Sequence, residues 1–379
     1  MTFCALSSAK GMDINMKEKI GFIGLGLIGG SIAKAIRQYY PDFELVAFDK
    51  QKETLALAAQ EGIIDTACSS INDSFCNCTY LFLCAPVAYN NAYLAQLKTY
   101  LHEGCILTDV GSVKNSIHEA VKKLGLEEYF IGGHPMAGSE KSGFANAKAI
   151  LIENAYFVLT PSEKVSPEKV TAYKDFIASL KAIPIIMNAK EHDFVTGTIS
   201  HLPHIIASGL VNFVEQTDTA NEYMKLLAAG GFKDITRIAS SSPTMWQHIC
   251  LKNHKQISEI LDAYIHLLIE TKKSVETCNT EQLYDFFDRA NNYRNSIPDS
   301  SFGCIKKEFV IYCDIIDEAG GIATIATILA SNHISIKNIG IIHNREFEEG
   351  VLRIEFYEEL SSQKAVKLLQ KYRYIVYER

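Results

Sequence analysis

A glycine-rich stretch near the start of the chain, GFIGLGLIGGSIAKAI from Gly21, constrains the fold more than any other feature. A β-rich run precedes it, a helical pattern follows it, and its glycines have the spacing G-x-G-x-x-G. The next β-rich run ends at Asp49, twenty residues after Gly29. In that arrangement a pyrophosphate binds at the helix N-terminus and the carboxylate accepts ribose hydroxyls. The spacing alone indicates only a tight turn, but its context predicts a dinucleotide site formed by Gly24, Gly26, Leu27, Ile28, Gly29 and Asp49.

The acidic residue at the end of the second strand bears on which dinucleotide binds. Asp49 would repel a 2′-phosphate, which favours NAD over NADP, while Lys50 and Lys52 would soften that preference. Further along, CAPV ends another β-rich run where the chain turns across the cofactor. Pro86 in this segment is therefore either a cofactor contact or an ordinary loop residue.

The whole chain divides into three regions by hydrophobic pattern. Up to about Met187, β-rich runs alternate with helical stretches, which predicts a doubly wound, Rossmann-type α/β sheet with AYFVLTP and AIPIIMN as its last strands. Long helical patterns then predict an all-α domain, and a β-α-β-β-α-β order follows. We expect a disordered leader at 1–16, the sheet domain at 17–188, the helical domain at 189–297, a linker at 298–305 and the small α/β unit at 306–379.

Composition excludes several classes of function. The net charge is −7 and no run of Lys or Arg stands out, so we expect no nucleic-acid partner. No apolar run approaches the ~20 residues of a membrane helix, and the N-terminus lacks the basic start and apolar region of a signal peptide. The ten cysteines are scattered through apolar segments, which predicts reduced thiols in a cytoplasmic protein with no membrane contact.

Two loops at the carboxyl ends of predicted strands carry candidate active-site residues. In TDVGSVK, Ser112 caps the following helix, faces a ligand, or does both. In GGHPMAGSE, His134 follows the next strand among small residues that would let a ligand approach. Its imidazole titrates near neutrality, which suits a group that accepts a proton or hydrogen bond from a substrate hydroxyl during hydride transfer. The alternative for His134 is a hydrogen-bonded or surface histidine without a catalytic role.

The helical region carries a second group of polar residues. TISHLPHIIASGL places Ser200, His201 and His204 within little more than one helical turn, and we expect Pro203 to kink the helix. Two histidines at this spacing can share a metal, but no carboxylate or cysteine lies at a suitable local spacing. We therefore expect no metal, and a polar wall for a substrate instead.

A third motif, AAGGFKDITRIASSSPTMW, contains Lys233, Asp234 and Arg237. Asp234 and Arg237 would pair on one helix face, where an exposed ion pair contributes little. Alternatively, the guanidinium of Arg237 forms a bidentate fork for a substrate carboxylate. Local sequence leaves both interpretations open.

Five segments together resemble the prephenate dehydrogenase family and occur in the family's order: GLGLIGGS, TDVGSVK, GGHPMAGSE, SHLPH and GGFKDITRIASSSPTMW. The resemblance covers nearly the whole chain after residue 17. It implies that prephenate and NAD⁺ give 4-hydroxyphenylpyruvate, CO₂ and NADH, a step of tyrosine biosynthesis. The cofactor implied is NAD, and a homodimer is expected.

The resemblance also implies roles for individual residues. His134 matches the catalytic histidine that takes the hydrogen bond and then the proton of the ring hydroxyl. Ser112 matches a serine that bonds the same hydroxyl and orients His134 and the nicotinamide, and Arg237 matches the arginine that binds a prephenate carboxylate. Other positions would line the substrate pocket, with or without residues of a second subunit: Glu140, Ser200, His204, Lys233 and Asp234.

The C-terminal unit is similar to an ACT domain, a small-molecule sensor appended to some members of this family. In DEAGGIATI, the glycines would let the backbone approach an amino acid, and the helix N-terminus suits its carboxylate. Tyrosine, the pathway product, is the implied ligand, and a dimerisation module without a ligand is the alternative. The implied ligand residues are Asp317, Gly320, Gly321, Ile322 and Asn338.

Three other functions remain open. An arogenate dehydrogenase would differ in one or two pocket side chains that the sequence does not identify. A different NAD-dependent 3-hydroxy acid dehydrogenase would share the two-domain plan but not the pairing of HPMAGSE with FKDITR. A catalytically silent amino-acid sensor would have no need for Ser112, His134 and Arg237 together.

Overall fold

The structure is a computed structural model that describes residues 18–85, 87–138, 141–297, 309–315, 320–342 and 350–378. The expected leader, the linker and most of the turn REFEEG therefore lie outside the described residues, as do three site candidates: Pro86, Glu140 and Asp317. The chain forms two compact units, Met1–Gly303 and Cys304–Arg379, and each is considered by itself.

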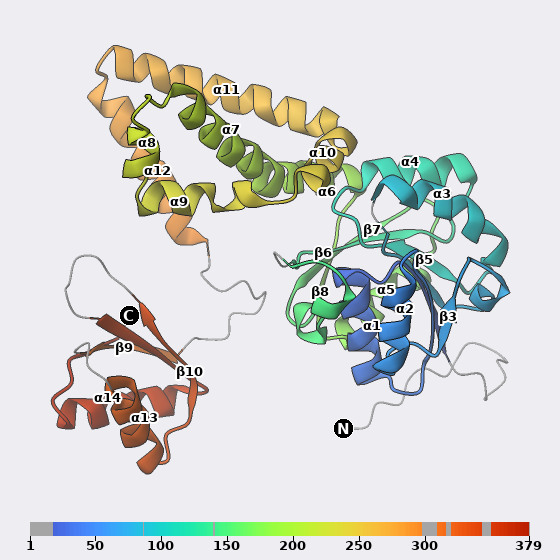
Figure 1. The fold of residues 1–379 in the computed structure, drawn as a ribbon, viewed down its shortest axis with the longest axis horizontal. Coiled ribbons are helices and arrows are strands. Elements are labelled where there is room, and N and C mark those ends of the chain that lie inside the picture. The colour runs from blue at the N-terminus through green and yellow to red at the C-terminus, as the bar shows by residue number, and fades with distance from the viewer. Residues whose placement is uncertain are drawn as a thin grey trace. The chain divides into compact units, whose positions relative to one another are not determined.

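The first unit begins with a five-stranded parallel sheet of order β3-β2-β1-β4-β5 (Figure 1). Strands β2 and β3 lie on one side of β1, and β4 and β5 lie on the other, so the strand order reverses between β1 and β4. In sheets of this kind, ligands bind at the carboxyl ends of the strands beside this reversal. The prediction of a doubly wound, Rossmann-type sheet is thus confirmed. The strands are β1 (Lys19–Ile23), β2 (Glu44–Phe48), β3 (Thr66–Cys68), β4 (Tyr80–Leu83) and β5 (Ile106–Asp109).

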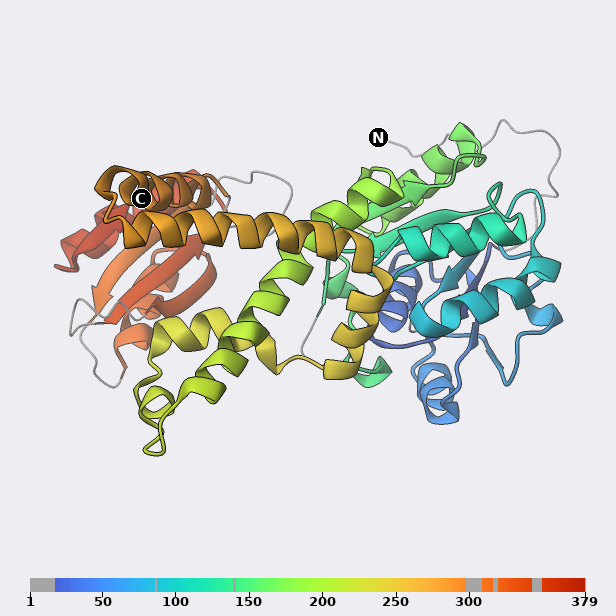
Figure 2. The same ribbon diagram turned by 90° about the horizontal axis from the view of Figure 1, so that it is seen from above.

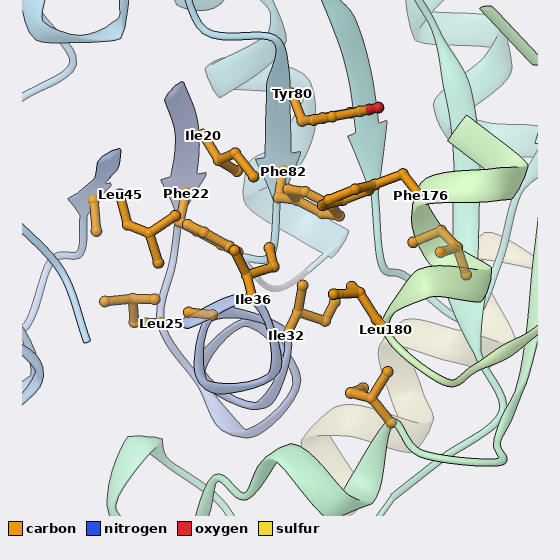
Figure 3. Close-up of a cluster of buried hydrophobic side chains, with 14 of the residues drawn as sticks. Ile20, Phe22, Leu25, Ile32, Ile36, Leu45, Tyr80, Phe82, Phe176 and Leu180 are labelled. Carbon is orange, nitrogen blue, oxygen red and sulfur yellow. The ribbon is translucent and has the colours of Figure 1, made fainter. Parts of the chain in front are cut away.

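Alternation along the strands sends side chains into two separate cores. Phe22 and its neighbours pack toward α1 (Leu27–Tyr39), α2 (Lys52–Gln60) and α5 (Pro167–Ser179). Ile23 instead packs with α3 (Val87–Leu97) and α4 (Asn115–Leu124) on the opposite face. Figure 3 shows the first of these cores, in which the Phe22 and Phe82 rings stack with centroids 5.2 Å apart. Each such buried side chain stabilises the unit by roughly 1.5–3 kcal/mol.

A second, three-stranded sheet has the order β6-β7-β8. Its strands are β6 (Ile131–Pro135), β7 (Tyr156–Pro161) and β8 (Ile183–Ile186), and an isolated parallel bridge between Leu107 and Phe130 connects it to the first sheet. We expected the last strands to continue the doubly wound sheet, but β6 and β7 are antiparallel. Parallel strands need a crossover connection, which is usually a helix. The described part of the connection between β6 and β7 contains two short 3₁₀ turns instead.

The rest of the first unit is helical, as expected (Figures 1 and 2). A π-helical turn, η5 (Gly197–His201), separates α6 (Ala189–Thr196) from α7 (Leu202–Thr217). Pro203 lies in the first turn of α7, directly after this π-helical turn, so the irregularity of the run lies next to the proline, as expected. The remaining elements are α8 (Tyr223–Leu227), α9 (Gly230–Thr236), η6 (Arg237–Ser240), α10 (Pro243–Lys252), α11 (His254–Glu276) and α12 (Thr280–Ser296).

One helical run, Ala189–Thr217, is long and apolar enough to cross a bilayer by length and composition. This is weak evidence for a membrane span, because a helix of a soluble protein passes the same test. Here His192, Asp193 and His201 on this run are buried in hydrogen bonds within the first unit. The run is therefore part of the fold of that unit.

The second unit has the predicted β-α-β-β-α-β order. Its four strands form an antiparallel sheet of order β10-β11-β9-β12, with a core that includes Ile311, Leu352 and Leu369. The elements are β9 (Phe309–Ile315), α13 (Gly321–Ser331), β10 (Ile336–Ile342), β11 (Gly350–Phe356), α14 (Glu359–Lys371) and β12 (Val376–Glu378).

Candidate active site

The glycine turn between β1 and α1 has the geometry of a dinucleotide site. Gly24 has φ +98°, and a Cβ on it would lie 2.8 Å from the amide nitrogen of Ala85. A Cβ on Gly29 would lie 2.6 Å from the carbonyl oxygen of Gly24, so these two glycines are required by packing within the protein. A Cβ on Gly26, in contrast, would meet nothing within 4 Å in the described part of the chain. The missing side chain at Gly26 therefore leaves room for a ligand at the N-terminus of α1, where Leu27 and Ile28 form the first turn.

Asp49 connects the end of β2 to this turn. Its Oδ2 accepts a hydrogen bond from the Leu25 amide at 2.8 Å, and its Oδ1 accepts one from the Gln51 amide at 2.8 Å. A carboxylate has about four lone-pair sites, so both oxygens can still accept ribose hydroxyls. Lys50, the cation beside it, lies over the Tyr89 ring at 4.2 Å from the centroid. These residues fit NAD.

The loop after β5 is built around a buried ion pair. The Lys114 ammonium donates to both carboxylate oxygens of Asp109 at 2.6 Å and to the carbonyl oxygen of Gly133 at 2.6 Å. Both charged side chains are essentially inaccessible to water. Burial lowers the pKa of Lys114 and the Asp109 charge opposes that shift. The pair thereby connects the Ser112 loop to the residue that precedes His134.

Ser112 does not cap the following helix. Helix α4 begins at Asn115, and its first amides, those of Lys114 and Asn115, donate to the two carboxylate oxygens of Asp193 at 2.7 and 2.8 Å. A carboxylate from α6 thus occupies the N-terminus of α4, where its charge also suits the helix dipole. Ser112, which lies between Asp109 and Lys114 in the sequence, is partly buried. Since Asp193 takes the capping position, the hydroxyl of Ser112 is available for a ligand.

His134 lies in β6, next to β5, and is partly exposed. Its Nδ1 is 2.8 Å from Nε2 of His192, and Nδ1 of His192 is 2.8 Å from Oδ1 of Asp193. Burial lowers the pKa of His134 well below its usual value, and the nearby His192 and Lys114 lower it further. At neutral pH the imidazole of His134 is therefore uncharged and can accept a proton.

Not all of the small residues beside His134 leave space for a ligand, contrary to our expectation. A Cβ on Gly133 would lie 2.7 Å from the carbonyl oxygen of Asp109, and one on Gly132 would lie 2.4 Å from Oγ1 of Thr160. These glycines are required because β6 packs closely against its neighbours. A Cβ on Gly138, in contrast, would meet no atom of the described residues within 4 Å.

The helical part adds a second histidine cluster. Asn253 donates from Nδ2 to the Asp193 carbonyl at 2.9 Å, and the same atom lies 3.1 Å from Nδ1 of His201. Burial lowers the pKa of His201 to about 4. His204 stacks on Trp246 with ring centroids 3.7 Å apart, and its Nδ1 donates to the Ser200 carbonyl at 3.0 Å. Within the described part of the chain, no group of three or more His, Cys, Asp or Glu side chains could hold a metal ion.

The candidates from FKDITR lie on exposed positions. Lys233 and Asp234 are on α9, and Arg237 begins η6, which contacts α7. Helix α7 also carries His204 near its start. That Lys233, Asp234 and Arg237 contact a substrate stays a prediction.

Sequence reasoning missed four residues of the site: Asp109, Lys114, His192 and Asp193. The first two were within TDVGSVK, but a lysine next to Asn115 in a predicted loop gave no sign that it would be buried. The other two were within a helical pattern at the expected domain boundary. Only the tertiary fold gives them partners, at the start of α4 for Asp193 and on β6 for His192. An adjacent acid and histidine at a domain junction is the one signal that could have indicated them.

The Rossmann-type sheet, its glycine turn with Asp49, and a neutral histidine at the crevice define an NAD-dependent dehydrogenase. The chain belongs to the prephenate dehydrogenase family. The nucleotide-binding domain of prephenate dehydrogenase matches residues 32–186, and the dimerization domain of that enzyme matches residues 188–289.

Individual relatives agree with this assignment. The chain is 38% identical over 360 residues to prephenate dehydrogenase of Bacillus subtilis, which covers 94% of this chain and 96% of the relative. A crystal structure of prephenate dehydrogenase from A. aeolicus with hydroxyphenyl propionate and NAD⁺ has a TM-score of 0.70 and 29% identity, and covers 76% of this chain and 100% of that one. A crystal structure of Synechocystis arogenate dehydrogenase has a TM-score of 0.68 and 28% identity, and covers 73% of this chain and 99% of that one.

Proposed function

We propose that the protein oxidises prephenate with NAD⁺ to 4-hydroxyphenylpyruvate and CO₂ in tyrosine biosynthesis. Bound NAD⁺ supplies the hydride acceptor. Hydride leaves the ring carbon that bears the hydroxyl, the hydroxyl proton goes to His134, and the carbon–carboxylate bond breaks with its electron pair entering the ring. The aromatic product takes a proton back as a phenol. The observation that carries the proposal is the uncharged His134 at the crevice beside the Ser112 loop, in a chain of this family.

The other candidates take supporting roles in this reaction. Ser112 bonds the same hydroxyl as His134, and the Arg237 guanidinium binds a substrate carboxylate. The remaining pocket residues complete the substrate site: Glu140, Ser200, His204, Lys233 and Asp234. Aromatisation supplies much of the driving force, so positioning and a general base worth ~10² to 10⁴ in rate are sufficient.

Arogenate is the second candidate substrate, because a solved relative is named as an arogenate dehydrogenase and covers 73% of this chain. Purified protein should form NADH from prephenate faster than from arogenate, followed at the absorbance of NADH. A higher kcat/KM with arogenate would assign the alternative, and no NADH from either would leave the catalytically silent sensor. In the His134→Asn variant, kcat should fall by about 10² or more while KM changes little, and an unchanged kcat would remove His134 from catalysis.

We propose a homodimer formed by the helical part. Large apolar side chains are exposed there, including Phe213, Tyr284 and Phe287, which are 62%, 70% and 66% exposed. Such a concentration of exposed apolar surface is typical of an interface, and the matching family domain is described as a dimerization domain. Sedimentation should give a dimer, and Phe287→Glu should weaken it.

The eight cysteines at described positions are free, which suits the reducing cytoplasm we propose.

We propose that tyrosine binds the ACT-like unit and inhibits the enzyme. Gly320 has φ +95° at the start of α13, and among the residues that the structure describes no atom lies within 4 Å of a Cβ built on it. Gly321 and Ile322 form the first turn of α13, and Asn338 is exposed on β10. Tyrosine should lower the rate of NADH formation, and Gly320→Val should remove that effect while leaving the uninhibited rate near that of the wild type. Equal inhibition of both proteins would place the tyrosine site elsewhere.

A further inference from the structure

Three side chains form a hydrogen-bonded series that crosses from the helical part to the sheet. Oδ1 of Asp193 is 2.8 Å from Nδ1 of His192, and Nε2 of His192 is 2.8 Å from Nδ1 of His134. His192 and Asp193 are completely buried, whereas His134 is partly exposed. The series thus begins inside the protein and ends at the crevice.

The positions of the protons in this series follow from the chemistry of its ends. An ionised carboxylate can only accept, so Nδ1 of His192 carries the proton that it donates to Asp193. In the tautomer with its proton on Nδ1, His192 has a lone pair on Nε2, and this atom accepts from Nδ1 of His134. The one remaining nitrogen of His134, Nε2, therefore carries no proton.

Asp193, at the start of this series, is held in place from both parts of the first unit. Its two oxygens accept the amides of Lys114 and Asn115 at 2.7 and 2.8 Å, at the N-terminus of α4. Its own carbonyl accepts from Asn253 at 2.9 Å, which fixes the backbone of α6 at this point. The carboxylate is thus held by the sheet domain while its backbone is held by the helical part.

We propose that His192 and Asp193 are positioning residues that hold His134 with Nε2 unprotonated and directed to the substrate as the general base. The proposal rests on the role of His134 in the proposed function. During hydride transfer the substrate proton goes to Nε2 of His134, and Nδ1 keeps its proton and its bond to His192. The positive charge that develops on His134 is separated from the Asp193 carboxylate by the His192 ring. The Lys114 ammonium and His201 are the other titratable groups near His134. A histidine that lost this support would spend part of its time with the proton on Nε2, where it cannot act as a base.

Nitrogen-15 NMR of the histidine side chains tests the proposal without any substrate. In the wild-type protein, the His134 signals, identified by their loss in His134→Asn, should show a protonated Nδ1 and an unprotonated Nε2. In His192→Leu both tautomers should be populated. A wild-type spectrum that shows Nε2 protonated would overturn the proposal.

Kinetics separate a positioning role from a merely structural one. In His192→Leu, kcat should fall between about 10- and 10³-fold, with KM for both substrates within about threefold of the wild type. In His192→Gln, the side-chain carbonyl can accept from Nδ1 of His134, so kcat should recover by at least about tenfold over His192→Leu. His102→Gln is the matched control, because His102 bonds the Cys78 carbonyl at 3.2 Å in another part of the sheet domain, and it should leave kcat unchanged.

The outcomes distinguish this proposal from the proposed function. A wild-type kcat in His192→Leu, or no recovery in His192→Gln with normal folding of both variants, would overturn the positioning role. Absence of NADH from prephenate and arogenate in the wild type would instead overturn the proposed function, and the tautomer of His134 would still decide whether the series holds the proton as inferred.

Discussion

The buried ion pair between Lys114 and Asp109 makes a sharp prediction about stability. Lys114→Met keeps the aliphatic stem of the side chain and removes the ammonium that bonds both Asp109 oxygens and the Gly133 carbonyl at 2.6 Å. The Asp109 carboxylate, 1% exposed, would remain buried without its cation and keep only the backbone amides of Gly111 and Gly133. Breaking a buried pair in this way costs about 3–5 kcal/mol, a large part of the roughly 5–15 kcal/mol that stabilises a domain.

Chemical denaturation followed by tryptophan fluorescence measures this loss. Trp246 is the only tryptophan in the chain and lies in the first unit, so its signal reports on the unit that contains the pair. Lys164→Met is the matched control, because Lys164 forms the same kind of pair with Glu127 at 2.9 Å but its side chain is 61% exposed. That variant should leave the denaturation midpoint nearly unchanged.

A second substitution tests the cause of the loss. Adding Asp109→Asn to Lys114→Met removes the unpaired charge and keeps one oxygen that accepts one of the two backbone amides, so the double variant should recover at least about 1 kcal/mol. The reasoning would be refuted by a loss below about 1 kcal/mol in Lys114→Met, or by a double variant no more stable than the single one. Because the pair holds the Ser112 loop against the residue before His134, kcat should fall in Lys114→Met as well.

Three further predictions follow from the site. Gly26→Ala should raise KM for NAD⁺ with little change in denaturation midpoint, whereas Gly29→Ala, whose Cβ would lie 2.6 Å from a carbonyl oxygen, should lose about 1–3 kcal/mol of stability. Asp49→Ser should raise kcat/KM for NADP⁺ relative to NAD⁺ by at least about tenfold, and an unchanged ratio would remove Asp49 from cofactor selection. In the folded protein the pKa of His134 lies well below 6.5 and that of His201 is about 4, so both imidazoles stay neutral as the pH falls below 6.5. In the unfolded chain both become protonated as the pH falls through about 6.5. Stability should therefore fall as the pH drops from 6.5 toward 4, by on the order of 3 kcal/mol from His201 alone, and a midpoint that is constant over this range would contradict the shift.

Much of the fold could be predicted from local pattern. The glycine spacing around Gly24, Gly26 and Gly29 required a strand, a tight turn and a helix, because few backbones satisfy those positions. The alternation of runs predicted the doubly wound sheet, and the order of runs predicted the C-terminal β-α-β-β-α-β unit. The reversal between β6 and β7 was missed, because strand direction depends on the connection and leaves little trace in the periodicity of each strand.

The sequence by itself determined which residues could do chemistry, and the tertiary structure decided how they are held. His134 was identifiable because a titratable side chain at the end of a buried strand is a local feature. Its partners His192 and Asp193 lie 58 and 59 positions further along the chain, and only the packing of α6 on the sheet domain brings them together. The same packing caps α4 with Asp193, which leaves Ser112 available to a ligand. Hydrogen bonds between distant segments depend on distances that no spacing rule encodes, so the protonation state of His134 is a property of the folded molecule alone.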